Sequence, residues 1–510
     1  MPSAIETEFK LTGSDEAVAW LRRSMMIRAL AVKTGAREHY RTLFFDTPDE
    51  ALARAGMSLR MRYDADALLQ IVKVRGGLFK RREIETRLKS PRAFPAPTGV
   101  AAIDTKISAY KSRLKIKTIV NTDRQTIVLR RRNALIEAAF DRCVVNGAAP
   151  GAAHFSEAEF EILKGGRRAL AELAALIFEE AGRAPSGVPL SLSCAEKSLR
   201  ARAALGGTLP PAPNSIALDP KASAGDALAA GLGFCAAAVM AASPLVTAHN
   251  APEGVRRLRI ALRRFRSIER LFRTAANDPT LHSLALEARR YARVLGAARD
   301  WDVFVNETLA ETMRAQPADS AMKERLEALR DAAERHRIAA WHDMLDEIRS
   351  ADFARFVLAL VKAARAGRSE KALKTPVRRF ARKALEKRLR EARKIGRTLD
   401  EKTPAAGHPL RISLKKLRYA AQLFRDLYAR DARKPYMASM SYLQDAFGGL
   451  NDAVVAQDLA NRAAKGQGSD VARAAGFVCG YRAAAAQKTA SQIAESWAAF
   501  EAYPPFWRSK

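Results

Sequence analysis

Alternation of charged and apolar residues marks the first two hundred positions of the chain. Near the N-terminus, Glu6, Glu8 and Lys10 occupy every second position, with apolar side chains on the other phase. The same alternation recurs at residues 59–62, 71–74, 81–85, 136–141 and 157–162. Successive side chains of a strand lie on opposite faces of its sheet. The pattern therefore predicts an antiparallel sheet with one charged face and one apolar face.

The charged face repeats acid-x-acid and base-x-base rather than mixed polar residues. A solvated face is the ordinary interpretation of any one such strand. For six strands, a closed barrel with charges inside and apolar residues outside, against covering helices, explains the pattern better. Crowded carboxylates repel unless a cation lies among them, and crowded bases need an anion. A divalent metal together with a phosphate chain satisfies both, and oxygen ligands without His or Cys suit Mg²⁺ or Mn²⁺.

A proline-rich segment separates this half from a very different one. Residues 206–223 read GGTLPPAPNSIALDPKAS, which is typical of a linker. Beyond it, long stretches rich in Ala, Leu and Arg have helical periodicity and no comparable strand pattern. We expect a β-rich domain at 1–205, a linker at 206–221 and an all-helical domain at 222–510.

The helical half contains an internal duplication. RRLRIALRRFRS at 256–267 and HPLRISLKKLRY at 408–419 align at an offset of 152 residues. Gly296 and Asp300 align with Gly448 and Asp452 at the same offset. Two motifs at one offset predict two related helical bundles. For Asp300, Asp302 and Asp452 we favour helix capping or pairing with arginine over metal binding.

Basic residues in this half recur every three or four positions, which places them on one helix face. The first series comprises Arg256, Arg259, Arg263, Arg266, Arg270 and Arg273; the second comprises Arg379, Lys383, Lys387, Arg390, Lys394 and Arg397; the third comprises His408, Arg411, Lys415 and Arg418. Ordinary solvated faces mix both signs of charge. Series of one sign favour binding of a polyanion.

Composition supports a polyanionic partner and a globular chain. The 510 residues carry 87 Lys+Arg and 55 Asp+Glu, a formal net charge of +32, and 48% are hydrophobic. The four cysteines have no CxxC spacing, so we expect neither a zinc ribbon nor a redox dithiol, and we expect a cytoplasmic location. The uncharged stretch 227–252 could cross a bilayer by length, but it is rich in Ala and Gly and contains Pro244. We favour a buried bundle helix there and expect no membrane association.

The ordered motifs of the first half resemble a CYTH domain, the triphosphate tunnel metalloenzyme family. They are Glu6-x-Glu8-x-Lys10, Phe45-Asp46-Thr47-Pro48, Leu59-Arg60-x-Arg62, Lys73, Arg81-x-Glu83-x-Glu85 and Glu157-x-Glu159-x-Glu161. The resemblance covers about residues 3–203 and implies an eight-stranded antiparallel barrel that hydrolyses or cyclises triphosphate compounds. Two places depart from the family pattern: Leu163 stands where a Lys is usual, and Ser-Lys-x-x-Arg-Gly appears as Glu196-Lys197-Ser198-Leu199-Arg200-Ala201.

The resemblance also implies roles for individual residues. Metal would be held by Glu6, Glu8, Glu159 and Glu161. Phosphate would be held by Lys10, Arg60, Arg62, Lys73, Arg81 and Arg124, with Lys197 retained from the late motif. Apart from the resemblance, Glu83 and Glu85 are candidates to orient the attacking water, and the sequence does not assign the base.

The duplicated motif of the second half resembles a CHAD domain, an all-helical family associated with polyphosphate, over about residues 222–500. In the first repeat, Arg256 replaces the expected His. The resemblance and the basic series together give these candidate polyphosphate-binding residues: Arg256, Arg259, Arg263, Arg379, Lys383, Lys387, Arg390, Lys394, His408, Arg411, Lys415 and Arg418.

The leading hypothesis is a cytoplasmic inorganic triphosphatase of α+β two-domain architecture. Its barrel hydrolyses inorganic triphosphate or a related triphosphate with Mg²⁺ or Mn²⁺, and its helical half binds inorganic polyphosphate, with polyphosphate granules as one location. Two alternatives stay open. One is another triphosphate enzyme, such as a thiamine triphosphatase or a class IV adenylate cyclase. The other is a non-catalytic polyphosphate-binding or granule-associated protein, or a nucleic-acid binder, which the scarcity of aromatic residues among the basic helices disfavours.

Overall fold

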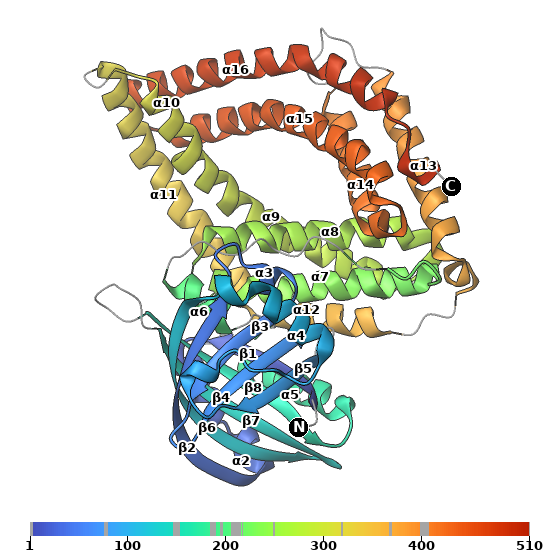
Figure 1. Ribbon diagram of the computed structural model, residues 1–510. Coiled ribbons are helices and arrows are strands. Elements are labelled where there is room, and N and C mark those ends of the chain that lie inside the picture. The colour runs from blue at the N-terminus through green and yellow to red at the C-terminus, as the bar shows by residue number, and fades with distance from the viewer. Residues whose placement is uncertain are drawn as a thin grey trace. The chain divides into compact units, whose positions relative to one another are not determined.

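The computed structural model describes residues 4–75, 80–145, 153–183, 190–193, 197–205, 216, 218–247, 250–317, 320–366, 370–397 and 407–508 (Figure 1). Most of the linker expected at 206–221 lies outside these residues. The chain forms two compact units. The first comprises Met1–Pro213, Ala236–Leu258 and Leu345–Val361, and the second comprises Asn214–Cys235, Arg259–Met344 and Lys362–Lys510.

The first half forms one curled antiparallel sheet, drawn in blue to teal in Figure 1. Its strands are β1 (Ala4–Gly13), β2 (Ala31–Asp46), β3 (Met57–Tyr63), β4 (Leu68–Arg75), β5 (Lys80–Arg87), β6 (Lys115–Arg131), β7 (Ala134–Val145), β8 (Ala153–Lys164) and β9 (Ser191–Ser193). The order is β5-β4-β3-β2-β6-β7-β8-β1-β9, and an additional pairing of β1 with β5 closes the sheet. The predicted eight-stranded barrel is confirmed, and the short β9 is added beside β1.

Apolar residues lie on the face opposite to the charged one, as the alternation predicts. Phe9 of β1 stacks on Phe160 of β8 at 4.8 Å, and Phe140 of β7 meets Phe160 edge-on at 6.1 Å. The short helices of this half are α1 (Asp15–Arg23), α2 (Met25–Leu30), α3 (Ala51–Arg54), α4 (Ala101–Tyr110), α5 (Arg167–Arg183) and α6 (Lys197–Ala204). On α4, Ile103 and Ile107 pack with Leu59 and Val72 of the barrel. Burying this layer holds the charged face inward.

The Phe45-Asp46-Thr47-Pro48 motif has a local structural role. The Asp46 carboxylate accepts backbone hydrogen bonds from Thr47, Leu52 and Ala53 at 2.8 to 3.0 Å. These bonds satisfy amide groups at the start of α3, which has no internal partners for them. Asp46 therefore fixes the turn between β2 and α3 and does not line the tunnel.

The second half is helical, as predicted. Its α-helices are α7 (Ala224–Thr247), α8 (Pro252–Ala276), α9 (Pro279–Val303), α10 (Ala310–Arg314), α11 (Ala321–Arg349), α12 (Ala351–Arg365), α13 (Val377–Gly396), α14 (Gly407–Phe424), α15 (Arg430–Ala464) and α16 (Ser469–Ala502). The duplication is visible in the element order, because α8 and α9 carry the first copies of the two motifs while α14 and α15 carry the second. Trp301, Phe304, Leu326 and Leu459 belong to one buried cluster that joins α9, α11 and α15.

A single described helix, α7, is long and apolar enough to span a membrane by length and composition. Within its most apolar window, 61% of the residues are buried. Leu228, Leu232 and Val239 are fully buried. This burial is typical of the core helix of a folded bundle.

Candidate functional site

A cavity of about 170 Å³ lies inside the barrel. Its lining is almost entirely charged or polar: Glu8, Tyr40, Thr42, Arg60, Arg62, Lys73, Glu83, Glu85, Arg124, Glu159, Glu161 and Lys197. These side chains come from seven strands and from α6. The structure thus brings together most of the residues that the sequence predicts for metal and phosphate binding.

The basic residues on one wall are held by acidic residues of β5. The Arg60 guanidinium lies 3.3 Å from Glu83, which also pairs with Lys73. Arg62 lies 3.6 Å from Glu85. The register explains these contacts, because Lys73 stands opposite Glu83 and β3 is the next strand. Glu83 and Glu85 thus hold the basic side chains of this wall in place.

Carboxylates gather on three neighbouring strands. Glu161 of β8 stands opposite Glu8 of β1 and opposite Glu137 of β7, so the three side chains share the inner face. Three adjacent oxygen donors without His or Cys form a set that a hard divalent cation fits. Glu6 and Arg81 are paired along the backbone of β1 and β5, but their side chains lie outside the described part of the structure.

A second group of charged side chains surrounds Glu159 of β8. Lys10 donates a hydrogen bond to Glu159, and Arg124 lies 2.8 Å from the other oxygen of the same carboxylate. Burial alone would raise the pKa of Glu159, but Lys10, Arg124 and Lys197 outweigh burial and hold it well below its usual range. Glu159 therefore stays ionised and is already balanced by bases.

The predicted Lys197 closes one end of this network from α6. Its Nζ lies 2.6 Å from Asp141 and 3.2 Å from Glu157. Burial would lower the pKa of Lys197, but Asp141 and its other neighbours raise it well above the usual value. Arg200 of the same helix is fully buried and donates to Glu157 at 2.8 Å. This helix therefore contributes charge to the barrel interior.

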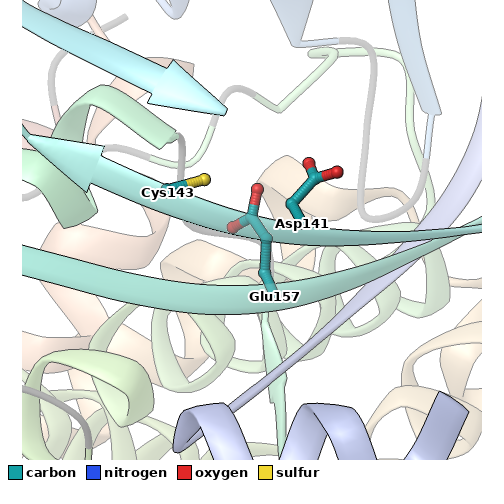
Figure 2. Close-up of side chains that lie close together, drawn as sticks. All are labelled: Asp141, Cys143 and Glu157. Carbon is teal, nitrogen blue, oxygen red and sulfur yellow. The ribbon is translucent and has the colours of Figure 1, made fainter. Parts of the chain in front are cut away.

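Asp141, Cys143 and Glu157 form a compact buried group, shown in Figure 2. Their potential ligand atoms lie within 4.8 Å of one another, which makes the group a possible metal site by ligand type. However, both carboxylates are already paired with Lys197, Arg124 or Arg200. Burial raises the pKa of the Cys143 thiol to about 12, so it stays protonated. By ligand type alone, the row of Glu8, Glu161 and Glu137 suits a hard divalent cation better, because it holds three carboxylates and no thiol.

A larger cavity, about 310 Å³, lies on the outer face of the barrel beside α1. Its Arg37 and Asp123 pair with each other, and Asp15 pairs with Arg142. Arg37, Asp123 and Arg142 stand on the strand phase opposite to the tunnel. We take the smaller inner cavity as the functional candidate, because the residues that the sequence predicts for metal and phosphate binding line it.

Several residues of the tunnel have no role in the sequence-based assignment. They are Tyr40, Thr42, Glu137, Asp141, Glu157 and Arg200. Of these, Glu137, Asp141 and Glu157 already lie on the charged phase of the alternation. Tyr40 and Thr42 precede the Asp46 turn in β2, where no alternation of charge singles them out.

In the helical half, basic residues of both repeats converge. Arg259 and Arg263 of α8 and Arg411 of α14 all act electrostatically on Lys415. Burial first, and then these guanidinium groups, lower the pKa of Lys415 to about 7. Arg259 and Arg411, like Arg263 and Lys415, are related by the 152-residue offset. The duplication thus builds one cationic cluster from two copies of a motif.

The series on α8 is less uniform in sign than the sequence suggests. Arg256 donates to Glu253, Arg273 donates to Glu269, and Arg259 lies 3.4 Å from Asp300. The acidic partners on α8 itself, Glu253 and Glu269, stand three or four residues away and so lie on the same helix face as the series. Half of the series is therefore compensated.

The series on α13 is different. Arg379, Lys383, Lys387, Arg390, Lys394 and Arg397 are all exposed, and none forms an ion pair with a carboxylate in the part of the chain that the structure describes. In the third series, the side chain of His408 lies outside the described residues, whereas Arg411, Lys415 and Arg418 are half-buried on α14. Basic side chains gathered on one helix face favour the binding of a polyanion.

Asp300 and Asp302 form ion pairs rather than helix caps. Asp302 is buried, accepts a hydrogen bond from the Trp341 indole at 2.8 Å and lies 3.2 Å from Arg337. Burial raises the pKa of both Asp300 and Asp302. Both stand near the C-terminal end of α9, where a side chain cannot cap amide groups at a helix start.

Comparisons with known proteins agree with this division. Residues 4–185 match the CYTH domain model, and residues 230–461 match the CHAD domain model. No match to the chain was found among curated proteins. CYTH enzymes include triphosphatases and adenylate cyclase-like proteins, and they depend on a metal.

Three solved structures are similar to parts of the chain. The CHAD domain from the plant Ricinus communis is 26% identical, with a TM-score of 0.49, over 57% of this chain and 96% of its own. PptA from Streptomyces chartreusis is 18% identical, with a TM-score of 0.45, over 54% of this chain and 100% of its own. HpAC1 from Hippeastrum, described as an adenylyl cyclase with a dominant triphosphatase activity, is 21% identical, with a TM-score of 0.27, over 40% of this chain and 98% of its own. Taken with the two domain models, the barrel and the duplicated helices identify the chain as a CYTH domain followed by a CHAD domain.

Proposed function

We propose that the barrel hydrolyses inorganic triphosphate, or a closely related triphosphate, and that the helical half binds inorganic polyphosphate. The observation that carries the first part is the inner cavity, where Arg60, Arg62, Lys73, Arg124 and Lys197 meet Glu8 and Glu161. A triphosphate is a short chain of anionic groups that needs cations along its length. A terminal phosphate bound to a metal needs carboxylates beside it.

The reaction is phosphoryl transfer to water. Water attacks the terminal phosphorus, the bond to the bridging oxygen breaks, and phosphate and pyrophosphate leave. The guanidinium groups of Arg60 and Arg62 bind equatorial oxygens, on which negative charge accumulates in the transition state. Glu83 is fixed between Arg60 and Lys73, which leaves it placed to accept a hydrogen bond from the attacking water.

The metal would be held by Glu8 and Glu161, with Glu137 in the same row. When bound, Mg²⁺ or Mn²⁺ neutralises phosphate charge and polarises the terminal group. Lys10 keeps Glu159 ionised and in place on the adjacent strand position. In this proposal Glu8, Glu161 and Glu137 bind the cation, whereas Glu159 pairs with the basic side chains.

The proposal that the helical half binds polyphosphate rests on basic side chains that no described carboxylate pairs with and on basic side chains that lie close together. The α13 series is exposed, and the cluster of Arg263, Arg411 and Lys415 holds like charges together. A flexible polyanion can follow such surfaces without any base-reading contacts. A cytoplasmic location is part of the same proposal.

Release of phosphate tests the proposal directly. Inorganic triphosphate, thiamine triphosphate, ATP and long-chain polyphosphate are each incubated with Mg²⁺, Mn²⁺ or a chelator. We expect metal-dependent release of phosphate, fastest from inorganic triphosphate. Formation of cyclic AMP from ATP would favour the cyclase alternative, and no turnover of any substrate, with polyphosphate still bound, would favour a binding protein.

A further inference from the structure

Tyr40 is the one aromatic residue among the described side chains that line the inner cavity. Its side chain is 9% exposed. The Arg62 guanidinium lies 5.2 Å from the centre of its ring, and the Arg124 guanidinium lies 5.7 Å from the same centre. Both distances fall within the range in which a guanidinium is attracted to an aromatic face.

The strand register explains this arrangement. In β2, Thr42 pairs with Arg62 of β3, and Glu38 pairs with Arg124 of β6. Tyr40 stands between Thr42 and Glu38 on the same inward phase. Its ring is therefore a diagonal neighbour of one arginine on each adjacent strand, a separation that an aromatic side chain can bridge.

The two arginines differ in how firmly carboxylates hold them. Arg124 donates two hydrogen bonds of 2.7 Å to Asp141. Arg62 has only longer contacts, 3.6 Å to Glu85 and 4.0 Å to Asp64. Its Nε is buried and has no hydrogen-bond partner in the part of the chain that the structure describes. The buried Tyr40 ring thus packs beside a guanidinium that carboxylates hold less firmly than they hold Arg124.

We propose that Tyr40 is a positioning residue: its ring holds Arg62 beside the anchored Arg124, so that both guanidinium groups can bind oxygens of one phosphate chain. This inference rests on the proposed triphosphate chemistry of the tunnel. It assigns the role to the ring, since among the residues that the structure describes the Tyr40 hydroxyl forms no hydrogen bond to either arginine. Burial raises the pKa of Tyr40, so the hydroxyl stays neutral and adds no charge to the site.

The test compares two substitutions at this position. Tyr40→Phe keeps the ring and removes the hydroxyl, whereas Tyr40→Leu removes the ring. We expect the Phe variant to stay within about twofold of the unaltered protein and the Leu variant to lose about tenfold or more in kcat/KM for triphosphate. Tyr63→Leu is the matched control, because Tyr63 lies on β3 beside Arg62 but on the opposite phase.

A double-variant cycle separates positioning from simple stability. If the ring acts through Arg62, Tyr40→Leu adds little to the loss already caused by Arg62→Ala. Equal losses in the Phe and Leu variants would overturn the ring assignment, as would additive losses in the double variant. Melting temperatures identify any variant that is merely unfolded, and for such a variant Tyr40→Met, which refills the space without a ring, takes the place of Leu.

Binding of triphosphate by calorimetry in the presence of a chelator provides a readout besides turnover. If the unaltered protein binds triphosphate but does not hydrolyse it, the proposed hydrolysis is wrong, and Tyr40 is judged by the dissociation constants of the same variants. Equal dissociation constants for the unaltered protein and Tyr40→Leu, together with equal turnover where turnover exists, would overturn the inference alone.

Discussion

Arg124 and Asp141 form a buried two-point ion pair, with Nε–Oδ1 and Nη2–Oδ2 distances of 2.7 Å each. The Asp141 carboxylate has no exposed surface and also contacts Lys197 at 2.6 Å. Burial would raise the pKa of Asp141, yet Arg124 and Lys197 lower it. The pair thus joins the tunnel-facing side of β6 to the helix that supplies Lys197.

Asp141→Asn should destabilise the barrel strongly. It would leave two buried cations with less compensation, a change that typically costs about 3–5 kcal/mol. The matched control is Asp123→Asn, because Asp123 precedes Arg124 in β6 and forms a similar two-point pair with the exposed Arg37. We expect that substitution to cost less than about 1 kcal/mol. Denaturant unfolding of both variants checks this, and similar losses would contradict the buried-network interpretation.

The contribution of Asp141 also depends on pH, with a definite sign. A carboxyl whose pKa is lowered by folding stabilises the folded state above its ordinary pKa near 3.8. That stabilisation is lost as pH falls through the lowered pKa. Glu159 acts in the same direction, because its pKa is also held down. Thermal unfolding between pH 7 and pH 2 should therefore show a falling melting temperature, with a smaller fall in Asp141→Asn.

Replacing Glu8 or Glu161 by Gln should weaken metal use. Each substitution keeps the size of the side chain and removes one charge from the row that faces the cation. Turnover should collapse at limiting metal and recover in part at higher concentrations, since the remaining carboxylates still bind. Glu16→Gln on the exposed face of α1 is the control. Normal triphosphate hydrolysis by Glu8→Gln at limiting Mg²⁺ would rule out this metal site.

Arg60→Lys should damage turnover although it conserves charge. The Arg60 side chain is only 17% exposed and lies 3.3 Å from Glu83 inside the cavity. A lysine cannot reproduce two-point binding of phosphate oxygens by a guanidinium. We expect kcat/KM for triphosphate to fall by about tenfold or more, while Arg41→Lys, on the opposite phase of β2, has little effect. Unchanged kcat and KM in Arg60→Lys would remove Arg60 from the site.

The period-two alternation predicts which strand residues face the tunnel, because the phase of a strand is a local property. It does not predict which side chains meet there. Arg124 and Asp141 are in contact only because β6 and β7 pair in one register, and Lys10 reaches Glu159 across 149 residues of sequence. Register depends on turns and bulges elsewhere in the barrel. Tyr40 lies on a stretch without charge alternation, so the sequence pattern does not assign it a role in the tunnel.

The helical half shows a similar limit. The spacing of arginines on α8 predicts a common face, and that face exists. The same spacing places Glu253 and Glu269 on that face, where they pair with Arg256 and Arg273. Spacing does not reveal that Lys415 lies close enough to four guanidinium groups for its pKa to change. That feature depends on side-chain direction and on the packing of α8 against residues of the other repeat.

Polyphosphate binding near Lys415 should depend on pH. Burial and then Arg263, Arg411 and Arg418 lower the pKa of Lys415 from 10.5 to about 7, so near neutral pH the lysine is only partly charged. A bound phosphate would restore the proton, and affinity should fall as pH rises from 6 to 9. Lys415→Arg should remove most of this dependence, because a guanidinium stays charged. Calorimetry in two buffers of different ionisation enthalpy measures the proton uptake, and identical uptake in both proteins would contradict the role of Lys415.

Without ligand, the lowered pKa of Lys415 makes folding stability rise with pH, as the lowered pKa of Asp141 does, but in a different pH range. Between pH 7 and 10.5 the unfolded chain binds more protons at this lysine than the folded protein does, so stability should rise with pH across that window. Lys415→Gln should flatten this rise. A melting temperature that rises equally in both proteins would assign the effect to other groups.

The affinity of the α13 series for polyphosphate should depend on the series being uninterrupted. Lys387 and Arg390 stand in the middle of six exposed bases on Val377–Gly396 and the residue that follows, so reversing both to Glu divides the series into two short pieces. Arg335 and Lys465 are the matched control pair, because they are also exposed bases but lie on different elements. Both double variants change the net charge equally.

Since each neutralised phosphate releases counterions, affinity for long polyphosphate should fall steeply with salt, and the slope should decrease in the α13 variant. Titration of the full chain at two salt concentrations, with short and long polymers, measures both effects. Equal losses from the two double variants, or binding that does not change with salt, would show that net charge rather than the α13 series holds the polymer.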